Sequence, residues 1–579
     1  MRGNSTTRRS RMAAAAVTAV LVATVAGACT VDEPEDTGVS GRPDVGGTVR
    51  IATQAGGFET LDPQRLFITS QMNASKLITR TLTTFMPAPG LEGAEIVGDL
   101  ATDMGRPNKD NTVWEFTLRS GLKWETGETV TCDDVRYGVL RNFDIRNGED
   151  AVVIGGPPYP VKWLDAPDDY AGPLSDPDVH VPGVVCIDDD TIRFKLKESV
   201  PHFPAALSMT AFSPVPQGEG VDGDYVPVAT GPYKLEEFSP PAEDSVGAAV
   251  FVRNDQWDAE TDPVRSAYPD RVEYVFGADV EETAQQIVAG NPDYDNVVMY
   301  ESVPANYLQQ VVNDTQLMSQ TVNGQTNGIT YMAINTRTVT DLECRQALVY
   351  GFNKRKYLDI RGGQLLGEYA NSMIGPDDPG HKDFDIYGLK DNPEGDLERA
   401  RQLLDEAGDC PTELTLDAPD TPANKLTAQT VVDTYGRMGI AVKLNLIDIA
   451  SYYSVLDYPE NQHDLVITGW ASDWPGGSGV LPALFHGDML IEGANSNFSL
   501  LDDPEINAMM DAAASADNLE QSYDLWGEVD QAVQEMAVSV PISYMKVMSL
   551  CGPDVRGGFL NAQWSAVDIS SLGLVDETA

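Results

Sequence analysis

Beyond its first 28 residues the sequence has no apolar run long enough to cross a membrane. A transmembrane helix needs about 20 consecutive apolar residues. Residues 12–28 are almost wholly apolar or small, but this run is short and rich in Ala and Thr. The folded part of the chain is therefore not expected to span a membrane. With 579 residues, of which 42% are hydrophobic, the chain is long enough for more than one domain with real cores.

Basic residues are scarce. The chain has 39 Lys and Arg against 89 Asp and Glu, which gives a formal net charge of −50. So acidic a surface argues against nucleic acid as a partner. It could steer cationic ligands toward the protein, or it could simply keep an exported protein soluble, and both interpretations stay open.

The residues that usually carry metal or redox chemistry are few and scattered. No Cys-x-x-Cys pair and no His-Glu-x-x-His motif occurs, and phosphate-binding and dinucleotide-binding fingerprints are also missing. The sequence therefore predicts no metal and no cofactor, and an ATPase that works with this chain would be another polypeptide. The five histidines are His180, His202, His381, His463 and His486.

Two Ser-x-x-Lys matches, at Ser120 and Ser543, raise the possibility of an acylating enzyme. That chemistry needs the serine at the start of a helix. Ser120 falls in a predicted turn and Ser543 in a predicted strand, and no Lys-Thr-Gly partner is present. We expect no catalytic activity.

The N-terminus has the pattern of an export signal. Four arginines and no acid precede the apolar run, so residues 1–28 are predicted to be a signal peptide. The run ends in Val-Ala-Gly-Ala before Cys29, which resembles a bacterial lipobox and makes Cys29 the expected site of lipidation. Residues 29–47 are rich in acids, Pro and Gly and are predicted to be a disordered tether. The protein would then lie at the outer face of a membrane, held by its lipid only; an ordinary signal peptide with a chance cysteine is the alternative, and the export route stays open.

Residues 112–141 have the most regular pattern in the chain. Trp114, Phe116 and Leu118 alternate with polar residues, which indicates a half-buried strand. A turn follows, residues 122–125 are predicted to return as a second strand, and Thr131 is predicted to cap a helix.

This stretch also resembles one family, the extracytoplasmic solute-binding proteins of peptide and nickel importers, family 5. The shared pattern is W-x-F-x-L-R-x-G-x-K-W-x-D-G-x-x-V-T-x-x-D-V-x-Y-x-x-x-R, from which this chain departs at Thr126. The matching residues are Trp114, Phe116, Leu118, Arg119, Gly121, Lys123, Trp124, Gly127, Val130, Thr131, Asp134, Val135, Tyr137 and Arg141. The resemblance implies an α/β, two-lobed periplasmic-binding-protein (Venus-flytrap) fold, type II and cluster C-like, with an extra subdomain inserted in the first lobe. It also implies a monomer that captures a small solute for the permease and ATPase of an ABC importer.

Further family elements set the expected domains. Leu61-Asp62-Pro63, residues 229–233 (ATGPY) and residues 344–348 (CRQAL) resemble family motifs. Lobe I is expected at 48–81, 228–325 and 540–579, the inserted subdomain at 82–227 and lobe II at 326–539. Residues 147–183 are interpreted as a loop-rich region.

Several helix starts and one strand end are predicted from local signals. Asp279, Asp341, Asp396 and Asn518 are expected N-caps. The basic cluster 354–356 is interpreted as the C-terminal end of the helix capped by Asp341, and one strand is predicted to end at Thr468.

Five cysteines remain after Cys29. Cys132 and Cys186 are expected to form a disulfide, because both lie in the segment assigned to the inserted subdomain. Among Cys344, Cys410 and Cys551 we expect one pair and one free thiol, with the partners left open.

The ligand site is predicted just after Thr468, because ligands of open α/β sheets lie beyond the carboxyl ends of the strands. The segment Gly469, Trp470, Asp473, Trp474 matches the W-x-x-D segment of the family, whose Asp takes the α-ammonium of a peptide in peptide-binding members. The resemblance thus implies Asp473 as ammonium acceptor and Trp470 as a flat wall. Trp474 keeps a sugar ligand possible. The alternatives to a peptide are a nickel-chelate, an oligosaccharide or an opine, and the alternative to transport is a tethered sensor or scaffold.

Overall fold

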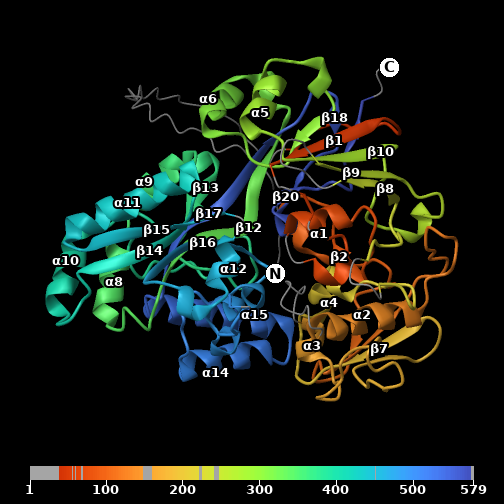
Figure 1. Ribbon diagram of the computed structural model, residues 1–579, viewed down its shortest axis with the longest axis horizontal. Coiled ribbons are helices and arrows are strands. Elements are labelled where there is room, and N and C mark those ends of the chain that lie inside the picture. The colour runs from red at the N-terminus through yellow and green to blue at the C-terminus, as the bar shows by residue number, and fades with distance from the viewer. Residues whose placement is uncertain are drawn as a thin grey trace, which may run out of the picture. The chain divides into compact units, whose positions relative to one another are not determined.

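The computed structural model describes residues 38–54, 57–58, 60–66, 69–147, 159–220, 225–239, 247–449, 451–493 and 495–575. The expected signal peptide, the lipidation site Cys29 and residues 29–37 of the expected tether lie outside the described residues. Strands and helices are mixed throughout the described part, so the α/β class expected from the sequence is confirmed (Figure 1).

The first described strand belongs to a five-stranded sheet. Strand β1 runs parallel to its two neighbours, β10 and β11, whereas β10, β9 and β8 follow one another antiparallel. In spatial order the strands are β11 (Val297–Met299), β1 (Thr48–Thr53), β10 (Arg271–Phe276), β9 (Gly247–Arg253) and β8 (Tyr233–Ser239). The helices of this part of the chain are α1 (Thr69–Ser75), α5 (Val280–Val288), α6 (Ala305–Asn313) and α7 (Thr315–Met318). Asp279 caps α5 as predicted, its carboxylate accepting the amide of Glu282.

A four-stranded antiparallel sheet lies between β1 and β8 in the sequence. Its order is β4 (Arg106–Pro107), β5 (Val113–Thr117), β7 (Thr191–Lys195) and β6 (Val184–Cys186). Three helices accompany it, namely α2 (Cys132–Asn147), α3 (Tyr159–Trp163) and α4 (Phe203–Ala206). The helix start predicted after Thr131 is confirmed, because Thr131 Oγ1 accepts the amide of Asp134 at 3.3 Å.

The predicted strand at 122–125 is wrong. Only an isolated bridge between Lys123 and Thr129 forms there, and β5 pairs instead with β7, more than 70 residues later. A disulfide joins Cys132 to Cys186, the pair expected from the sequence, and connects the start of α2 to the end of β6. The segment that directly follows β5 is thus not its partner, because β5 pairs with β4 on one side and with the distant β7 on the other.

A six-stranded sheet forms the other major part of the chain. In spatial order its strands are β13 (Gly367–Tyr369), β17 (Ser539–Leu550), β12 (Thr321–Ile334), β16 (Leu465–Ala471), β14 (Glu413–Pro419) and β15 (Ala441–Ile447). Its helices are α8 (Leu342–Gly351), α9 (Lys354–Ile360), α10 (Leu397–Glu406), α11 (Pro422–Met438), α12 (Tyr452–Leu456), α13 (Leu481–Phe485), α14 (Pro504–Ala514) and α15 (Leu519–Glu535).

Both faces of this sheet are covered. Met332 and Ile334 of β12 belong to the core shared with α8, α10 and α11, while Tyr331 and Ala333 belong to a second core shared with α13, α14 and α15. This alternation follows from the period of two in a strand. A sheet with helices on both sides is typical of α/β lobes.

Local helix signals in this part were correct at three starts and wrong at one. Asp341, Asp396 and Asn518 cap α8, α10 and α15 as predicted. The basic cluster that begins at Lys354, however, starts α9, capped by Asn353, instead of ending α8. Burial lowers the pKa of Lys354 to about 7, and its Nζ donates to the carbonyl of Ala370.

The remaining cysteines divide as expected from the sequence. Cys344 and Cys410 form a disulfide, and Cys551 is a buried free thiol. Three two-stranded sheets complete the described strands: β2 (Thr83–Phe85) with β3 (Ile96–Gly98), β18 (Val555–Arg556) with β21 (Gly573–Leu574), and β19 (Leu560–Asn561) with β20 (Ala566–Val567).

Two long strands connect the six-stranded sheet to the five-stranded sheet. β12 and β17 pair antiparallel over nearly their whole length, and their far ends reach β11, where Cys551 forms a bridge with Val298. The ladder between them is interrupted between Gln325 and Ile329. A broken ladder bends a strand pair locally.

A buried network of charges joins residues far apart in the sequence. Asp99 forms ion pairs of 2.8 Å with Arg80 and 2.9 Å with Arg265, and Arg265 also pairs with Asp262 at 3.2 Å. Burial opposes ionisation, yet the two guanidinium groups lower the pKa of Asp99 to about 2. The network links the hairpin β2–β3 to the segment that leads into β10.

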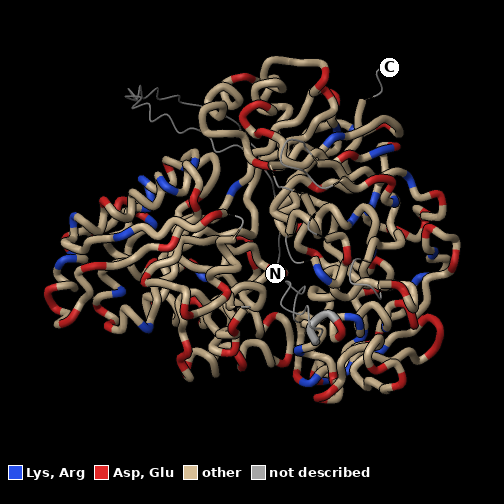
Figure 2. Tube along the Cα trace, in the orientation of Figure 1, with Lys and Arg blue, Asp and Glu red and all other residues tan. Residues whose placement is uncertain are grey.

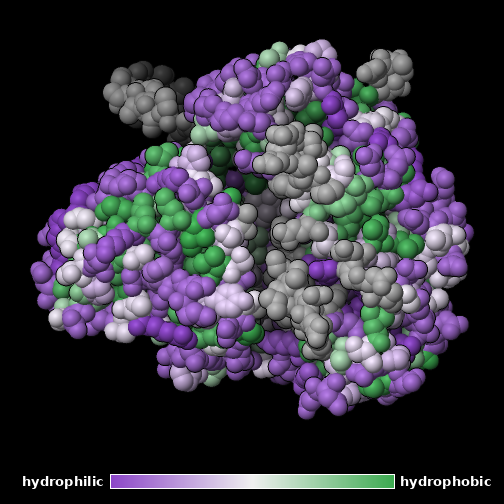
Figure 3. Space-filling view, in the orientation of Figure 1, coloured by the Kyte–Doolittle hydropathy of each residue, from purple (hydrophilic) through white to green (hydrophobic). Residues whose placement is uncertain are grey.

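Acidic residues predominate along the described trace (Figure 2). The visible face is mostly hydrophilic, with dispersed apolar patches (Figure 3). Over the described ranges, no helix is both long and apolar enough to cross a membrane.

Candidate functional site

The predicted ligand segment begins inside a strand. β16 continues to Ala471, so the predicted end at Thr468 is wrong, and Gly469 and Trp470 pair with Thr330 and Ile329 of β12. The sheet extends the strand because β12 supplies partners along this stretch. Trp470 is partly exposed, and its indole N–H donates to the carbonyl of Gly479 at 3.1 Å.

The chain then turns sharply in the loop 472–479. Ser472 Oγ donates to the carbonyl of Trp474, and the amide of Asp473 donates to the carbonyl of Gly479 at 3.2 Å. Gly476 has φ +97°, and a Cβ at this position would lie 2.8 Å from the Tyr523 ring. Glycine is suited to this position because it tolerates a positive φ and has no Cβ. The loop is thus compact and holds Asp473 at its start.

Asp473 contacts a residue of the four-stranded part of the chain. The hydroxyl of Tyr159, the first residue of α3, donates a hydrogen bond to Asp473 Oδ2. Burial raises the pKa of Asp473 to about 7, a rise that this hydrogen bond opposes. No Lys or Arg of the described part of the chain contributes to that shift, so the carboxylate has a neutral donor where an ammonium would bind more strongly.

Trp474 is buried in the same contact. Only 1% of its surface is exposed, and it belongs to the core around the four-stranded sheet. Its ring stacks on His202 with centroids 5.0 Å apart and meets Tyr159 edge-on at 4.8 Å. Burial lowers the pKa of His202 to about 3, so this histidine is neutral and brings no charge close to Asp473.

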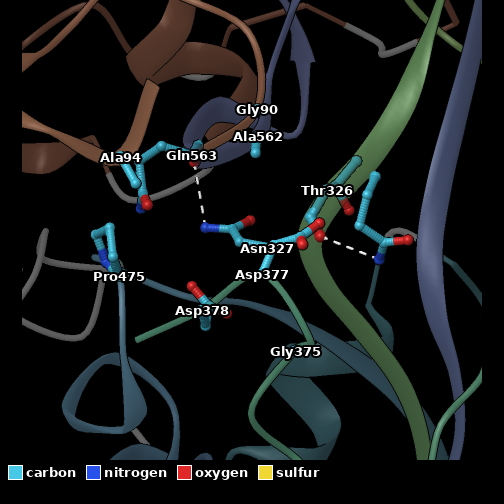
Figure 4. A pocket seen from close by; sticks show the side chains of 11 residues that line it. Gly90, Ala94, Thr326, Asn327, Gly375, Asp377, Asp378, Pro475, Ala562 and Gln563 are labelled. Carbon is cyan, nitrogen blue, oxygen red and sulfur yellow. Dashed lines mark hydrogen bonds between the residues drawn. The ribbon is translucent and has the colours of Figure 1, made fainter. Parts of the chain in front are cut away.

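A small cavity lies beside this loop (Figure 4). It is lined by Gly90, Ala94, Gln325, Thr326, Asn327, Gly375, Asp377, Asp378, Pro475, Ala562 and Gln563. Its volume of about 30 Å³ accommodates about two water molecules. Pockets for small ligands usually measure about 300–1,000 Å³, so a ligand needs the surrounding elements to separate. The cavity lies where the β12–β17 ladder is interrupted.

Asp378 is the second acidic group with a strongly raised pKa at this place. Burial raises its pKa to about 7, and the amides of Gly476 and Gly375, which hydrogen-bond to the carboxylate, oppose the rise. Figure 4 shows its side chain directed into the cavity near Asn327 and Pro475. Asp473 and Asp378 are therefore both connected to the loop 472–479.

The structure brings together part of the predicted site. Asp473 and Trp474 lie at the contact with α3, whereas Gly469 and Trp470 are strand residues, and Trp474 is too deeply buried to be accessible in this structure. Sequence reasoning missed Tyr159 and Asp378. Tyr159 lies in a region interpreted as loop, where the only helix signal is the proline in its first turn.

A family model and several known proteins match this chain over most of its length. The family described as "Bacterial extracellular solute-binding proteins, family 5 Middle" matches residues 95–489. The chain is 23% identical over 574 residues to the periplasmic oligopeptide-binding protein OppA of Salmonella typhimurium, covering 95% of this chain and 96% of that protein. It is 24% identical over 474 residues to the heme-binding protein A of Haemophilus influenzae, covering 77% and 79%.

Solved structures confirm the fold. The structure of "Clavulanic acid biosynthesis oligopeptide binding protein 2" superimposes with a TM-score of 0.84 at 29% identity, over 93% of this chain and 98% of that one. A dipeptide-binding protein from Pseudoalteromonas in complex with Met-Leu gives a TM-score of 0.71 at 20% identity, over 91% and 100%. The two-lobed α/β fold expected from the sequence is thus confirmed. Among the described residues, no group of three or more His, Cys, Asp or Glu is arranged to hold a metal ion.

Proposed function

Because this chain belongs to the bacterial extracellular solute-binding proteins, family 5, we propose that it captures a peptide through its free α-ammonium and delivers it to a membrane permease. The permease would be powered by a separate ATPase subunit of an ABC importer. The names of several relatives, among them oligopeptide-binding and dipeptide-binding proteins, support the choice of a peptide.

The observation that carries the proposal is the environment of Asp473. Its carboxylate is held at the contact with α3 by the phenol hydroxyl of Tyr159, and burial raises its pKa to about 7. An ionised carboxylate in such a place is stabilised by a cation. The ammonium of a peptide would supply that charge and contribute on the order of 1.5–3 kcal/mol.

The two long strands provide the movement that binding needs. We assign lobe I, its inserted subdomain and lobe II to the ranges expected from the sequence, so that β12 and β17 join the lobes. Rotation about the interrupted ladder near Gln325 would open the contact between Tyr159 and Asp473. Hinge closure around a ligand is a common motion of two-lobed binding proteins.

The same proposal includes the location of the protein. We infer export by the signal peptide, lipidation of Cys29 and attachment to the outer face of the membrane through that lipid alone. The protein would act as a monomer, because one chain contributes both sides of the site.

Isothermal titration calorimetry tests the peptide assignment. We expect trialanine to bind to the protein and N-acetyl-trialanine to bind at least about tenfold more weakly, because acetylation removes the charge that Asp473 recognises. Asp473→Asn should abolish this difference, whereas Asp457→Asn, which removes another carboxylate whose pKa burial raises, should not. Equal binding of both peptides to the unchanged protein would refute the ammonium assignment.

A further inference from the structure

The side-chain amides around the small cavity donate hydrogen bonds to backbone carbonyls. Asn327 Nδ2 donates to the carbonyl of Ser472 at 2.9 Å and to that of Gln563 at 3.5 Å, and Gln563 Nε2 also donates to Ser472 at 3.0 Å. Gln325 Nε2 donates to the carbonyls of Thr326 and Met545, each at 3.3 Å. Figure 4 shows two of these hydrogen bonds beside the cavity. All three amide nitrogens thus donate to backbone carbonyls in this structure.

What remains toward the cavity are acceptor oxygens. Gln325 Oε1 is fully buried and has no hydrogen-bond partner among the residues that the structure describes. The Asp378 carboxylate has backbone amides as donors and a second acid, Asp377, as its charged neighbour. A buried acceptor without a donor is costly, and Gln325 Oε1 is such a group. Together with the Asp378 carboxylate on the same cavity, it suits a ligand that brings donors and positive charge.

No basic side chain lines this cavity in the described part of the chain. Lys546 lies opposite Gln325 in the β12–β17 ladder, but its Nζ forms an ion pair with Glu368. Lys382 lies close to Gly527 and forms an ion pair with Glu528. The Asp378 carboxylate therefore has no basic side chain beside it among the described residues that line the cavity.

Asp378 and Asp473 lie close enough to act on one ligand. The amide of Gly476 hydrogen-bonds to the Asp378 carboxylate, and Gly476 is only three residues from Asp473. Three residues span at most about 11 Å, and the loop between these positions is folded back on itself by the bond from Asp473 N to Gly479 O. This spacing suits a ligand whose first residue carries two positive charges.

We propose that Asp378 and Gln325 form a second subsite that binds a side-chain cation, so that the preferred ligand begins with Arg or Lys and carries a free α-ammonium. The inference rests on the proposed function, because Asp473 is assigned the α-ammonium. A guanidinium has five N–H donors and an ammonium three, and either satisfies both a carboxylate and an amide oxygen. The shared chemistry, two cationic groups a few atoms apart, also occurs in a small diamine such as agmatine.

Calorimetry at pH 8 with matched peptides tests this subsite in the full-length protein. The probes are Arg-Ala-Ala, citrulline-Ala-Ala, which has the shape of the first peptide without its side-chain charge, and agmatine. We expect Arg-Ala-Ala to bind about ten- to a hundredfold more tightly than citrulline-Ala-Ala. Asp378→Asn should abolish this preference, Asp378→Glu should keep part of it, and Asp457→Asn should leave it unchanged. Circular dichroism melting of each variant checks that it is folded.

The outcomes separate this inference from the proposed function. Equal affinity of the two peptides, with both weakened by Asp473→Asn, would keep the peptide function and overturn the second subsite. Binding of agmatine alone, weakened by Asp378→Asn, would support the subsite and overturn the peptide function. A preference for Arg-Ala-Ala that survives Asp378→Asn would overturn the assignment to Asp378, and binding of none of the probes would overturn both proposals.

Discussion

Asp473→Asn should stabilise the unliganded protein in a pH-dependent way. Burial raises the pKa of Asp473 from 3.8 to about 7. Well below pH 3.8 the carboxyl group is protonated in both the folded and the unfolded chain, so its ionisation costs no stability, and at pH 4 the cost is still small. As the pH rises toward 7, the unfolded chain loses this proton before the folded chain does, and folding becomes progressively less favourable.

The size of the effect follows from the shift. Three pKa units correspond to about 4 kcal/mol at pH 8. Asp473 still has partial access to solvent, which reduces the cost, so we expect the substitution to add about 1–3 kcal/mol to the free energy of unfolding at pH 8 and almost nothing at pH 4. An asparagine still accepts the hydrogen bond from Tyr159, so the contact with α3 is kept.

Urea denaturation of the unliganded protein between pH 4 and pH 8 measures this difference. The control is Asp524→Asn, which removes an exposed carboxylate of α15 and should show no pH-dependent gain. If Asp473→Asn is no more stable than the unchanged protein at pH 8, the carboxylate is already compensated by another group. That result would refute the assignment of the Asp473 carboxylate as the acceptor of a ligand ammonium.

Three further predictions concern the fold around the site. Trp474→Ala should lower the free energy of unfolding by about 3–5 kcal/mol in urea denaturation, because it empties a fully buried aromatic volume; a loss below 1 kcal/mol would contradict the packing described. Asp99→Asn should cost about 3–5 kcal/mol by the same assay, because it leaves Arg265 buried without this carboxylate, and a neutral result would show that the network contributes little. Replacing Cys344 and Cys410 by Ser should cost about 4 kcal/mol, since the disulfide closes a loop of 66 residues; unchanged stability under oxidising conditions would contradict this.

Local signals predicted the helices better than the sheets. Asp279, Asp341 and Asn518 were found as helix caps because a cap depends on a few adjacent residues. The pairing of β5 with β7 could not be found in this way, because β7 lies beyond residue 190 and the nearer segment 122–125 has a similar apolar pattern. The basic residues that start α9 were likewise assigned to the wrong helix, because charge alone does not distinguish the end of one helix from the start of the next.

The candidate site was predicted in part. Asp473 was found from its resemblance to a family motif, but its partner Tyr159 comes from a five-residue helix in a region dense in Gly, Pro and Asp. Asp378 has no sequence signal at all, because its importance comes from burial and from the amide of Gly476, about 100 residues later in the chain. Contacts between distant segments of this kind are visible only once the chain is folded.

Native mass spectrometry of the protein extracted from its own host tests the central claim most directly. We expect a bound mass corresponding to a short peptide, present in the unchanged protein and in Asp457→Asn and lost in Asp473→Asn. A bound mass of a sugar or metal chelate, or a peptide retained equally by Asp473→Asn, would contradict the claim that this protein captures peptides through Asp473.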